Sequence, residues 1–98
     1  MKTCVEVVSY QLQKGVTRER YMPFVQQLQE SVKEMEGFIQ REVLYNEESG
    51  VWMEIIEWSS ADAAKQAEAK LMQEPCMMEG MELIDQTTLQ MHHLKQVL

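Results

Sequence analysis

Positive charge is scarce in this chain of 98 residues, which carries nine Lys and Arg against sixteen Asp and Glu and has a formal net charge of -7. The basic residues are scattered along the sequence, so no local cationic patch offsets the acidic balance. Binding to the phosphate backbone of a nucleic acid needs clustered cations. The sequence therefore argues against nucleic acid as a partner.

Long apolar runs and cysteines are also rare. No stretch approaches the roughly 20 apolar residues that a membrane-spanning helix needs, and the N-terminal sequence MKTCVEVVSY has no signal-peptide core. We therefore expect no membrane association and a cytoplasmic location. Cys4 and Cys76 lie far apart in unlike contexts, which favours free thiols over a disulfide. A chain of this length is expected to form one domain over residues 1–98.

The first third of the chain predicts a strand followed by a helix. Residues 3–13 are rich in β-branched side chains and end near Gly15, as expected for a strand. Thr17 is a candidate N-cap for a helix ending at Gly37. Pro23 predicts that the regular part of this helix begins only near that position. The helix carries one apolar stripe at alternating four- and three-residue spacing, made of Tyr21, Val25, Leu28, Val32 and Met35.

The rest of the chain predicts a hairpin, a helix and a last strand. Residues 37–58 read as two strands joined by a tight polar turn at 46–50. Either Ser59 or Ser60 caps the next helix, and Ser59-x-x-Asp62 resembles a capping box. We expect this alanine-rich helix to end at Pro75, before a short segment. The final strand is predicted at residues 86–96.

The resulting order, β-α-β-β-α-β, predicts a ferredoxin-like α+β fold. With right-handed crossovers, it gives a four-stranded antiparallel sheet that carries both helices on one face. The other face is left uncovered. A soluble protein rarely exposes a large apolar patch, so we predict a homodimer formed through that face of the sheet.

The strand at residues 51–58 has two unlike faces. One face is nearly apolar, whereas the other mixes aromatic side chains with a carboxylate. The first consists of Val51, Met53, Ile55 and Glu57, and the second of Trp52, Glu54, Ile56 and Trp58. The mixed face either meets a second copy of the chain or borders a pocket. The sequence leaves both alternatives open, because a register shift of one residue exchanges the faces.

The segment EGFIQREVLYNEESGVWMEIIEWSSADAAKQ resembles the antibiotic biosynthesis monooxygenase domain of the dimeric α+β barrel superfamily. The shared features are the pair Gly37-Phe38 at the second strand, Trp58 at the end of the third, and a serine cap at the second helix. The order of elements extends the resemblance over nearly the whole chain. The resemblance implies a homodimer whose paired sheets form a barrel, with a ligand pocket between each sheet and its helices.

This family includes oxygenases that convert phenols or quinols to quinones without metal or flavin, and others that degrade haem. Haem-degrading relatives carry an Asn on the first strand, a Trp inside the second helix and a His near its end. Val8, Ala67 and the histidine-free stretch CMMEGM stand near those positions here. The resemblance therefore implies a cofactor-independent monooxygenase with an aromatic phenol- or quinol-type substrate and no cofactor or metal. A non-catalytic dimeric module, which binds a small apolar ligand or a protein partner, is the alternative.

Three residues are candidates for catalysis. Glu54 lies beside two tryptophans and is a candidate general base, although a salt bridge to Arg41 on the neighbouring strand is an alternative. His92 and His93 are adjacent in a strand and point to opposite faces, so they do not form a metal-binding pair. One of them is expected to face the pocket, where it could act as a base near neutral pH.

Five residues are candidates for substrate binding. Trp52 and Trp58 could stack on an aromatic substrate or fill a structural interface, and Tyr45 could hydrogen-bond a phenolic ligand or a protein group. Met72 and Met78 belong to a methionine-rich segment around Cys76. Such a segment suits the wall of a pocket for a flat apolar ligand, or a packed core, better than a soft-metal site.

Overall fold

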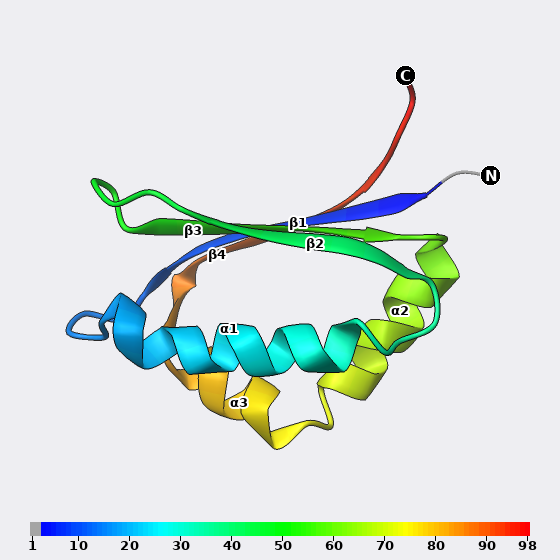
Figure 1. The fold of residues 1–98 in the computed structure, drawn as a ribbon. Helices are drawn as coiled ribbons and strands as arrows, with labels where there is room; N and C mark the ends of the chain where they lie inside the picture. The colour runs from blue at the N-terminus through cyan, green and yellow to red at the C-terminus, as the bar shows by residue number, and fades with distance from the viewer. Residues whose placement is uncertain (1–2) are drawn as a thin grey trace.

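The structure, a computed structural model, describes residues 3–98 and contains one antiparallel sheet with all its helices on one face (Figure 1). The strand order is β2-β3-β1-β4. The strands are β1 (Cys4–Leu12), β2 (Phe38–Tyr45), β3 (Val51–Trp58) and β4 (Ile84–Lys95). The helices are α1 (Arg18–Val32), α2 (Ala61–Leu71) and α3 (Pro75–Glu82). The predicted ferredoxin-like α+β fold is confirmed, with one helix more than predicted.

Helix α1 begins where the N-cap predicts. The Thr17 hydroxyl accepts a hydrogen bond from the backbone N–H of Arg20 at 3.1 Å. The helix is already regular at Arg18 and includes Pro23, so the prediction of a start near Pro23 is wrong. Pro23 removes only one backbone hydrogen bond. The buried side chains of Tyr21 and Val25 hold the turns on either side of it against the core.

The segment after β3 departs from the prediction at two points. Ser60, not Ser59, is the N-cap of α2 and accepts a hydrogen bond from the N–H of Ala63 at 3.0 Å, so the predicted capping box at Ser59 is wrong. Helix α2 ends at Leu71, and Pro75 begins α3 instead of ending α2. Proline suits the first position of a helix, where the N–H has no partner within the helix.

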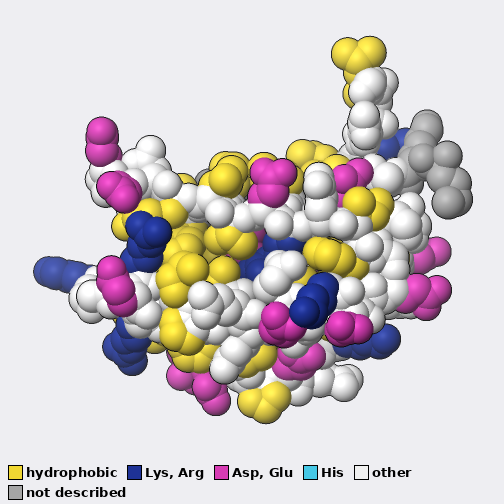
Figure 2. Space-filling view, in the orientation of Figure 1, with side chains coloured by type: hydrophobic (Ala, Val, Ile, Leu, Met, Phe, Trp, Pro, Cys, Tyr) yellow, Lys and Arg dark blue, Asp and Glu magenta, His cyan; other side chains and the backbone are white. Residues whose placement is uncertain are grey.

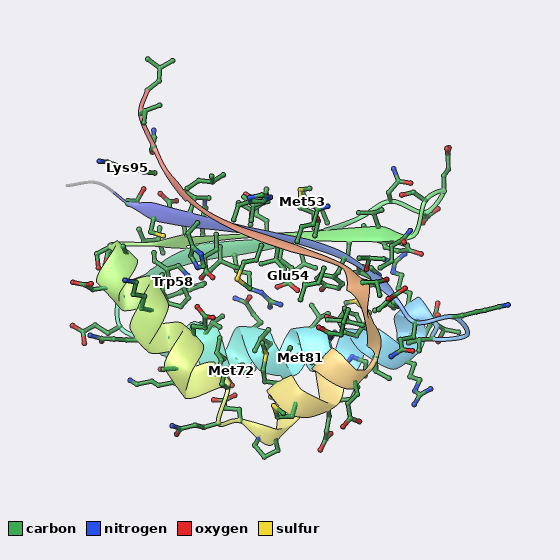
Figure 3. The ribbon with its side chains drawn as sticks, turned by 180° about the vertical axis from the view of Figure 1, so that it is seen from behind. Met53, Glu54, Trp58, Met72, Met81 and Lys95 are labelled. Atoms are coloured by element: carbon green, nitrogen blue, oxygen red, sulfur yellow. The ribbon has the colours of Figure 1, made fainter. Side chains whose placement is uncertain are left out.

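The helices cover one face of the sheet and leave the other uncovered. Met53 and Glu54 point to opposite sides of β3, and only Glu54 points toward the helices (Figure 3). Trp52 and Trp58 lie on the same side as Glu54 and are only 2% and 1% exposed. The mixed face of β3 therefore borders the core. The alternative that this face is uncovered and meets a second copy is wrong.

The outer face of the sheet carries apolar side chains with no helix over them. Leu44, Met53 and Leu94 are 47%, 37% and 50% exposed. The strand register places Val5, Val7 and Ile55 on the same face. Hydrophobic side chains are visible along this upper edge of the molecule in Figure 2. Among residues 3–98, no helix is both long enough and apolar enough to cross a membrane.

The chain between α1 and β2 passes close to α2 at Gly37. Its φ angle is +85°, and a Cβ added there would lie 2.5 Å from the Cβ of Ala63 and 2.8 Å from Oγ of Ser59. Gly50 also has a positive φ angle, +75°, but a Cβ there would meet no atom within 4 Å. A substitution at Gly50 therefore adds backbone strain alone, whereas one at Gly37 adds both backbone strain and steric overlap.

We predict that Gly37→Ala lowers the free energy of unfolding by about 2–5 kcal/mol, since it adds overpacking to left-handed backbone strain. Gly50→Ala is the matched control, and it is expected to cost about 1–2 kcal/mol from strain alone. Urea denaturation of both variants measures the difference. Equal losses would contradict the close approach of α2 to Gly37.

Candidate functional site

A cavity of about 140 Å³ lies between the sheet and the three helices. All seven elements contribute to its wall, which is mainly apolar and includes Val8, Leu28, Ile56, Met77, Met81 and Met91. An apolar cavity of about 150 Å³ is large enough to hold a benzene-sized ring. The space therefore suits a small ligand with one aromatic ring.

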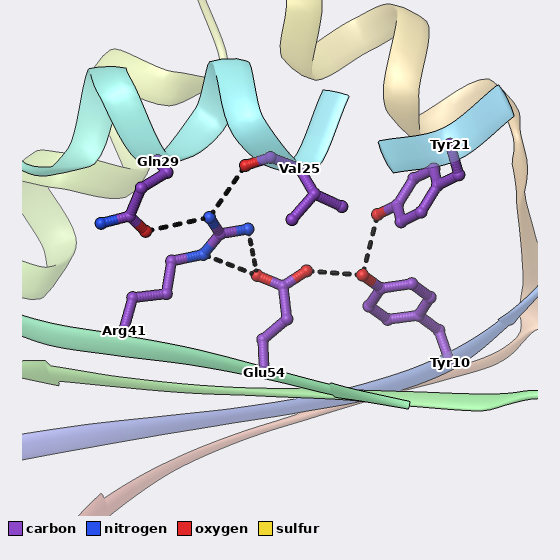
Figure 4. A network of polar contacts seen from close by, with 6 residues as sticks. All are labelled: Tyr10, Tyr21, Val25, Gln29, Arg41 and Glu54. Carbon is purple, nitrogen blue, oxygen red and sulfur yellow. Dashed lines mark hydrogen bonds and ion pairs between the residues drawn. The ribbon is translucent and has the colours of Figure 1, made fainter. Parts of the chain in front are cut away.

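A buried ion pair borders this cavity (Figure 4). Nε and Nη2 of Arg41 donate to Oε1 of Glu54 at 3.0 and 2.8 Å, and the two side chains are 1% and 9% exposed. Nη1 of Arg41 also donates to the backbone carbonyl of Val25 at 3.1 Å and to Oε1 of Gln29 at 3.3 Å. The salt bridge that the sequence left as an alternative for Glu54 is formed.

A register shift in β2 places Arg41 on the helix-facing side. Phe38 pairs with Trp58, but Gln40 pairs with Glu57, so the strand holds one residue more than its partner at Ile39. A bulge of this kind reverses which of the following side chains face inward. Arg41 consequently lies opposite Ile56 and beneath α1.

Two tyrosines continue the network from Glu54 (Figure 4). The hydroxyl of Tyr10 donates to Oε2 of Glu54 at 2.5 Å and lies 2.8 Å from the hydroxyl of Tyr21. Because the Tyr10 proton is directed to Glu54, Tyr21 is the donor in the second bond. Burial and the Glu54 carboxylate raise the pKa of Tyr10, and burial raises the pKa of Tyr21 to about 12. Both hydroxyls therefore stay protonated near neutral pH.

A second carboxylate, Glu6 of β1, also lines the cavity. Oε1 of Glu6 accepts a hydrogen bond from Nε1 of Trp58, and Oε2 lies 3.1 Å from Nε2 of His93. Glu6 is 8% exposed. Burial raises its pKa above the ordinary value, although the Trp58 hydrogen bond and the nearby His93 act in the opposite direction. His93 is itself 42% exposed and connects this carboxylate to solvent.

Glu6, Glu68 and His93 offer side-chain atoms that lie within 4.8 Å of one another, close enough to share a metal ion. Glu6 already accepts a hydrogen bond from Trp58 and contacts His93. These contacts satisfy the buried carboxylate without an ion. The arrangement is therefore explained by the hydrogen bonds of Glu6 beside the exposed carboxylate of Glu68, without a metal ion.

Of the residues predicted from the sequence, three lie at the cavity. Glu54 and Trp58 line it, and His93 contacts the cavity-lining carboxylate Glu6. Trp52 lies next to the site and is packed in an aromatic cluster, with its ring parallel to that of Tyr10 at 6.5 Å.

The other four predicted residues do not line the cavity. His92 pairs with Val7 on the outer face of the sheet. Tyr45 lies at the end of β2, with its ring 4.7 Å from that of Trp52. Met72 and Met78 are about half exposed and border a separate open groove. The structure thus separates these four side chains from the enclosed space.

Glu6 is the site residue that the sequence analysis missed. It shares the inward face of β1 with Cys4, Val8 and Tyr10. The signal that could have found it is a single carboxylate on a strand face that is otherwise apolar or aromatic. A buried carboxylate needs hydrogen-bonding partners, which here come from β3 and β4.

No family model matches the sequence, and no curated protein sequence matches it either. Solved structures do resemble it. SnoaB, a cofactor-independent oxygenase from Streptomyces nogalater, is 11% identical with a TM-score of 0.70, over 100% of this chain and 94% of that one. A proposed antibiotic biosynthesis monooxygenase from Bordetella bronchiseptica is 19% identical with a TM-score of 0.70, over 100% of both chains. A conserved protein from Methanosarcina mazei Go1 is 17% identical with a TM-score of 0.78, over 99% and 95%.

At these identities the likeness shows the fold alone. The chain has the ferredoxin-like α+β architecture found in SnoaB and in the Bordetella bronchiseptica protein. The resemblance to antibiotic biosynthesis monooxygenase domains is confirmed at the level of the fold. The activity of this chain has to be argued from its own cavity.

We predict that Arg41→Met lowers the free energy of unfolding by about 3–5 kcal/mol, because it leaves the Glu54 charge buried beside Tyr10 without a cation. The double variant Arg41→Met/Glu54→Met is expected to lose less than the sum of the two single variants, because the pair is removed together.

Arg18→Met is the matched control for this measurement. It breaks an exposed pair with Glu47 at 3.6 Å and is expected to cost less than about 1 kcal/mol. Chemical denaturation of all four variants gives the coupling energy. Strictly additive losses at Arg41 and Glu54 would contradict the ion pair.

Proposed function

We propose that this chain is a small cofactor-independent monooxygenase that acts on a phenol- or quinol-type aromatic substrate. The observation that carries the proposal is the apolar cavity between sheet and helices, whose wall includes two buried carboxylates, Glu6 and Glu54. SnoaB, which shares the fold, is named a cofactor-independent oxygenase. That likeness supports the proposal without extending to the substrate.

In the proposed reaction, the substrate hydroxyl loses its proton to a group in the cavity wall, and the resulting anion reacts with dioxygen. One oxygen atom of dioxygen replaces a hydrogen on a ring carbon and stays in the quinone product, and the other leaves as water with two of the hydrogens that the substrate loses. The protein contributes proton abstraction and exclusion of water. The ring of Trp58 forms part of the wall. Of the residues predicted to be catalytic, Glu54 lies in the wall as the partner of Arg41, and His93 contacts the wall carboxylate Glu6.

A non-catalytic module that binds a small apolar ligand is the second candidate. The observation that favours it is the size of the cavity, about 140 Å³, which is smaller than the roughly 300 Å³ of ordinary ligand pockets. Glu54 is also fully engaged by Arg41 and Tyr10. Turnover, rather than ligand binding, separates the two candidates.

We also propose that the chain forms a homodimer through the outer face of its sheet. The exposed side chains of Leu44, Met53 and Leu94 support this interface. Burying such a face removes apolar surface from water at about 25 cal/mol per Å² before the costs of association. The free thiols of Cys4 and Cys76 suit a reducing compartment, which supports a cytoplasmic location.

The oxygenase is tested by oxygen uptake. We predict that the chelator-treated protein accelerates uptake by at least one hydroquinone in a panel of single-ring compounds. Val8→Phe places a ring in the cavity and is expected to reduce this rate at least tenfold. Val97→Phe, at a position that is 90% exposed, is the matched control and is expected to retain it. Uptake at the buffer rate across the whole panel would reject the oxygenase in favour of the binding module.

The dimer is tested by light scattering at micromolar concentration. We predict a particle of twice the 11.5 kDa protomer mass, and a shift to the protomer mass in Met53→Lys, which places a charge on the outer face. Met78→Lys makes the same change at a comparably exposed methionine on α3, and this control is expected to stay dimeric. A wild-type particle of protomer mass would contradict the interface.

A further inference from the structure

Three carboxylates line the cavity, of which Glu68 is exposed and Glu6 and Glu54 are buried. The two buried ones differ in how their oxygens are occupied. Oε1 of Glu54 accepts two hydrogen bonds from Arg41, and Oε2 accepts one from Tyr10. Arg41 is 1% exposed, and Glu54 is its counterion inside the protein. Both oxygens of Glu54 therefore already accept from buried donors, and a substrate hydroxyl would have to compete with Arg41 or Tyr10 for them.

Glu6 is in a different environment. Its one short hydrogen bond from a fixed donor comes from Trp58, and no Lys or Arg among residues 3–98 forms an ion pair with it. Protonation of Glu6 therefore leaves no buried cation without a counterion. Burial also favours the protonated form, since desolvation penalises a carboxylate. The neighbouring titratable groups are Glu68 on α2, His93 on β4 and Cys4 on the same strand.

His93 gives the Glu6 proton a route to solvent. Its Nε2 lies 3.1 Å from Oε2 of Glu6, and its side chain is 42% exposed. An imidazole can accept a proton at one nitrogen and release another from the second. Glu6 thus faces the cavity with one side and a solvent-exposed imidazole with the other.

We propose that Glu6 is the catalytic base of this site and takes the proton of a phenolic hydroxyl bound in the cavity. This inference rests on the proposed function for the class of substrate. In the step, the substrate O–H bond breaks and its electron pair stays on the substrate oxygen. A new O–H bond forms on the Glu6 carboxylate. Glu54 instead holds Arg41 and Tyr10 in place.

The test uses 4-nitrophenol, a single-ring phenol that is yellow only when it is ionised. The dye is bound to wild-type protein and to Glu6→Gln, which keeps the shape of the side chain and an acceptor for Trp58. The Glu6 carboxylate accepts a hydrogen bond from the neutral dye and repels the ionised dye, as Glu54 does for Tyr10. At a pH near the pKa of the free dye, we therefore expect the ionised fraction of the bound dye to be at least tenfold higher in Glu6→Gln. Glu36→Gln, an exposed carboxylate outside the cavity, is the matched control and is expected to behave as wild type.

Trp58→Phe provides a change in the opposite direction. It keeps an aromatic ring but removes the hydrogen bond to Glu6, which makes Glu6 a stronger base. We expect the ionised fraction of the bound dye to fall at least twofold, because the unneutralised carboxylate holds the neutral dye more strongly. This variant also decides the question if Glu6→Gln does not fold, and an unchanged or higher fraction would then overturn the proposal.

The outcomes separate this inference from the proposed function. The same ionised fraction in wild type and folded Glu6→Gln would overturn Glu6 as the base, whatever the oxygen-uptake assay gives. Failure of the wild-type protein to bind the dye would overturn both the base and the phenol site. A higher ionised fraction in Glu6→Gln than in wild type, together with no uptake from any hydroquinone, would support the base and reject the oxygenase.

Discussion

The buried ion pair between Arg41 and Glu54 is the interaction on which the arrangement of this protein depends. It joins β2 to β3, and through Tyr10 and the Val25 carbonyl it extends to β1 and α1. Two charges withdrawn from water are tolerated only when their hydrogen-bonding capacity is filled. The bulge at Ile39, the register of the hairpin and the position of α1 over the sheet together meet this requirement. The apolar cavity is the space left beside the pair.

The same sheet gives its two inward carboxylates opposite properties. Glu54 has a buried guanidinium and a tyrosine hydroxyl as partners, whereas Glu6 has an indole N–H and an exposed imidazole. Pairs of titratable groups whose surroundings push their proton affinities apart are a common arrangement at sites of acid–base chemistry. Here the difference between Glu54 and Glu6 follows from the strands that lie beside them. Glu54 lies opposite the bulged strand that supplies Arg41, and Glu6 lies beside the strand that supplies His93.

The fold was predictable because each element carries its own local signal. The alternation in residues 51–58 defined two faces, and Thr17 marked the start of α1. The assignment of those faces to core and outer surface was not predictable, because it depends on where the helices pack. The bulge at Ile39, which turns Arg41 toward the helices, leaves no mark in the sequence. Pro75 was misread because proline is compatible with both the end and the first turn of a helix.

The site was less predictable than the fold for the same reason. Glu54 and Arg41 stand on strands that the hairpin pairs directly, and their contact was open to inference from sequence. Glu6 and His93 are separated by 87 positions and meet only because β1 and β4 are neighbours in the sheet. A long-range pairing of this kind becomes visible once the strand order and register are known. His92, adjacent in sequence, lies on the opposite face for the same geometric reason.

The volume of the cavity depends more on side chains than on the backbone. Its wall on the α3 side is formed by Met77 and Met81, with Met91 facing them from β4. Methionine is unbranched and changes rotamer easily, so these side chains can move to fit a ligand without displacing a helix. The polar part of the wall is rigid by comparison, because Arg41 and Glu54 are fixed by several hydrogen bonds. The methionine side of the cavity can therefore change shape, whereas the side formed by Arg41 and Glu54 keeps its geometry.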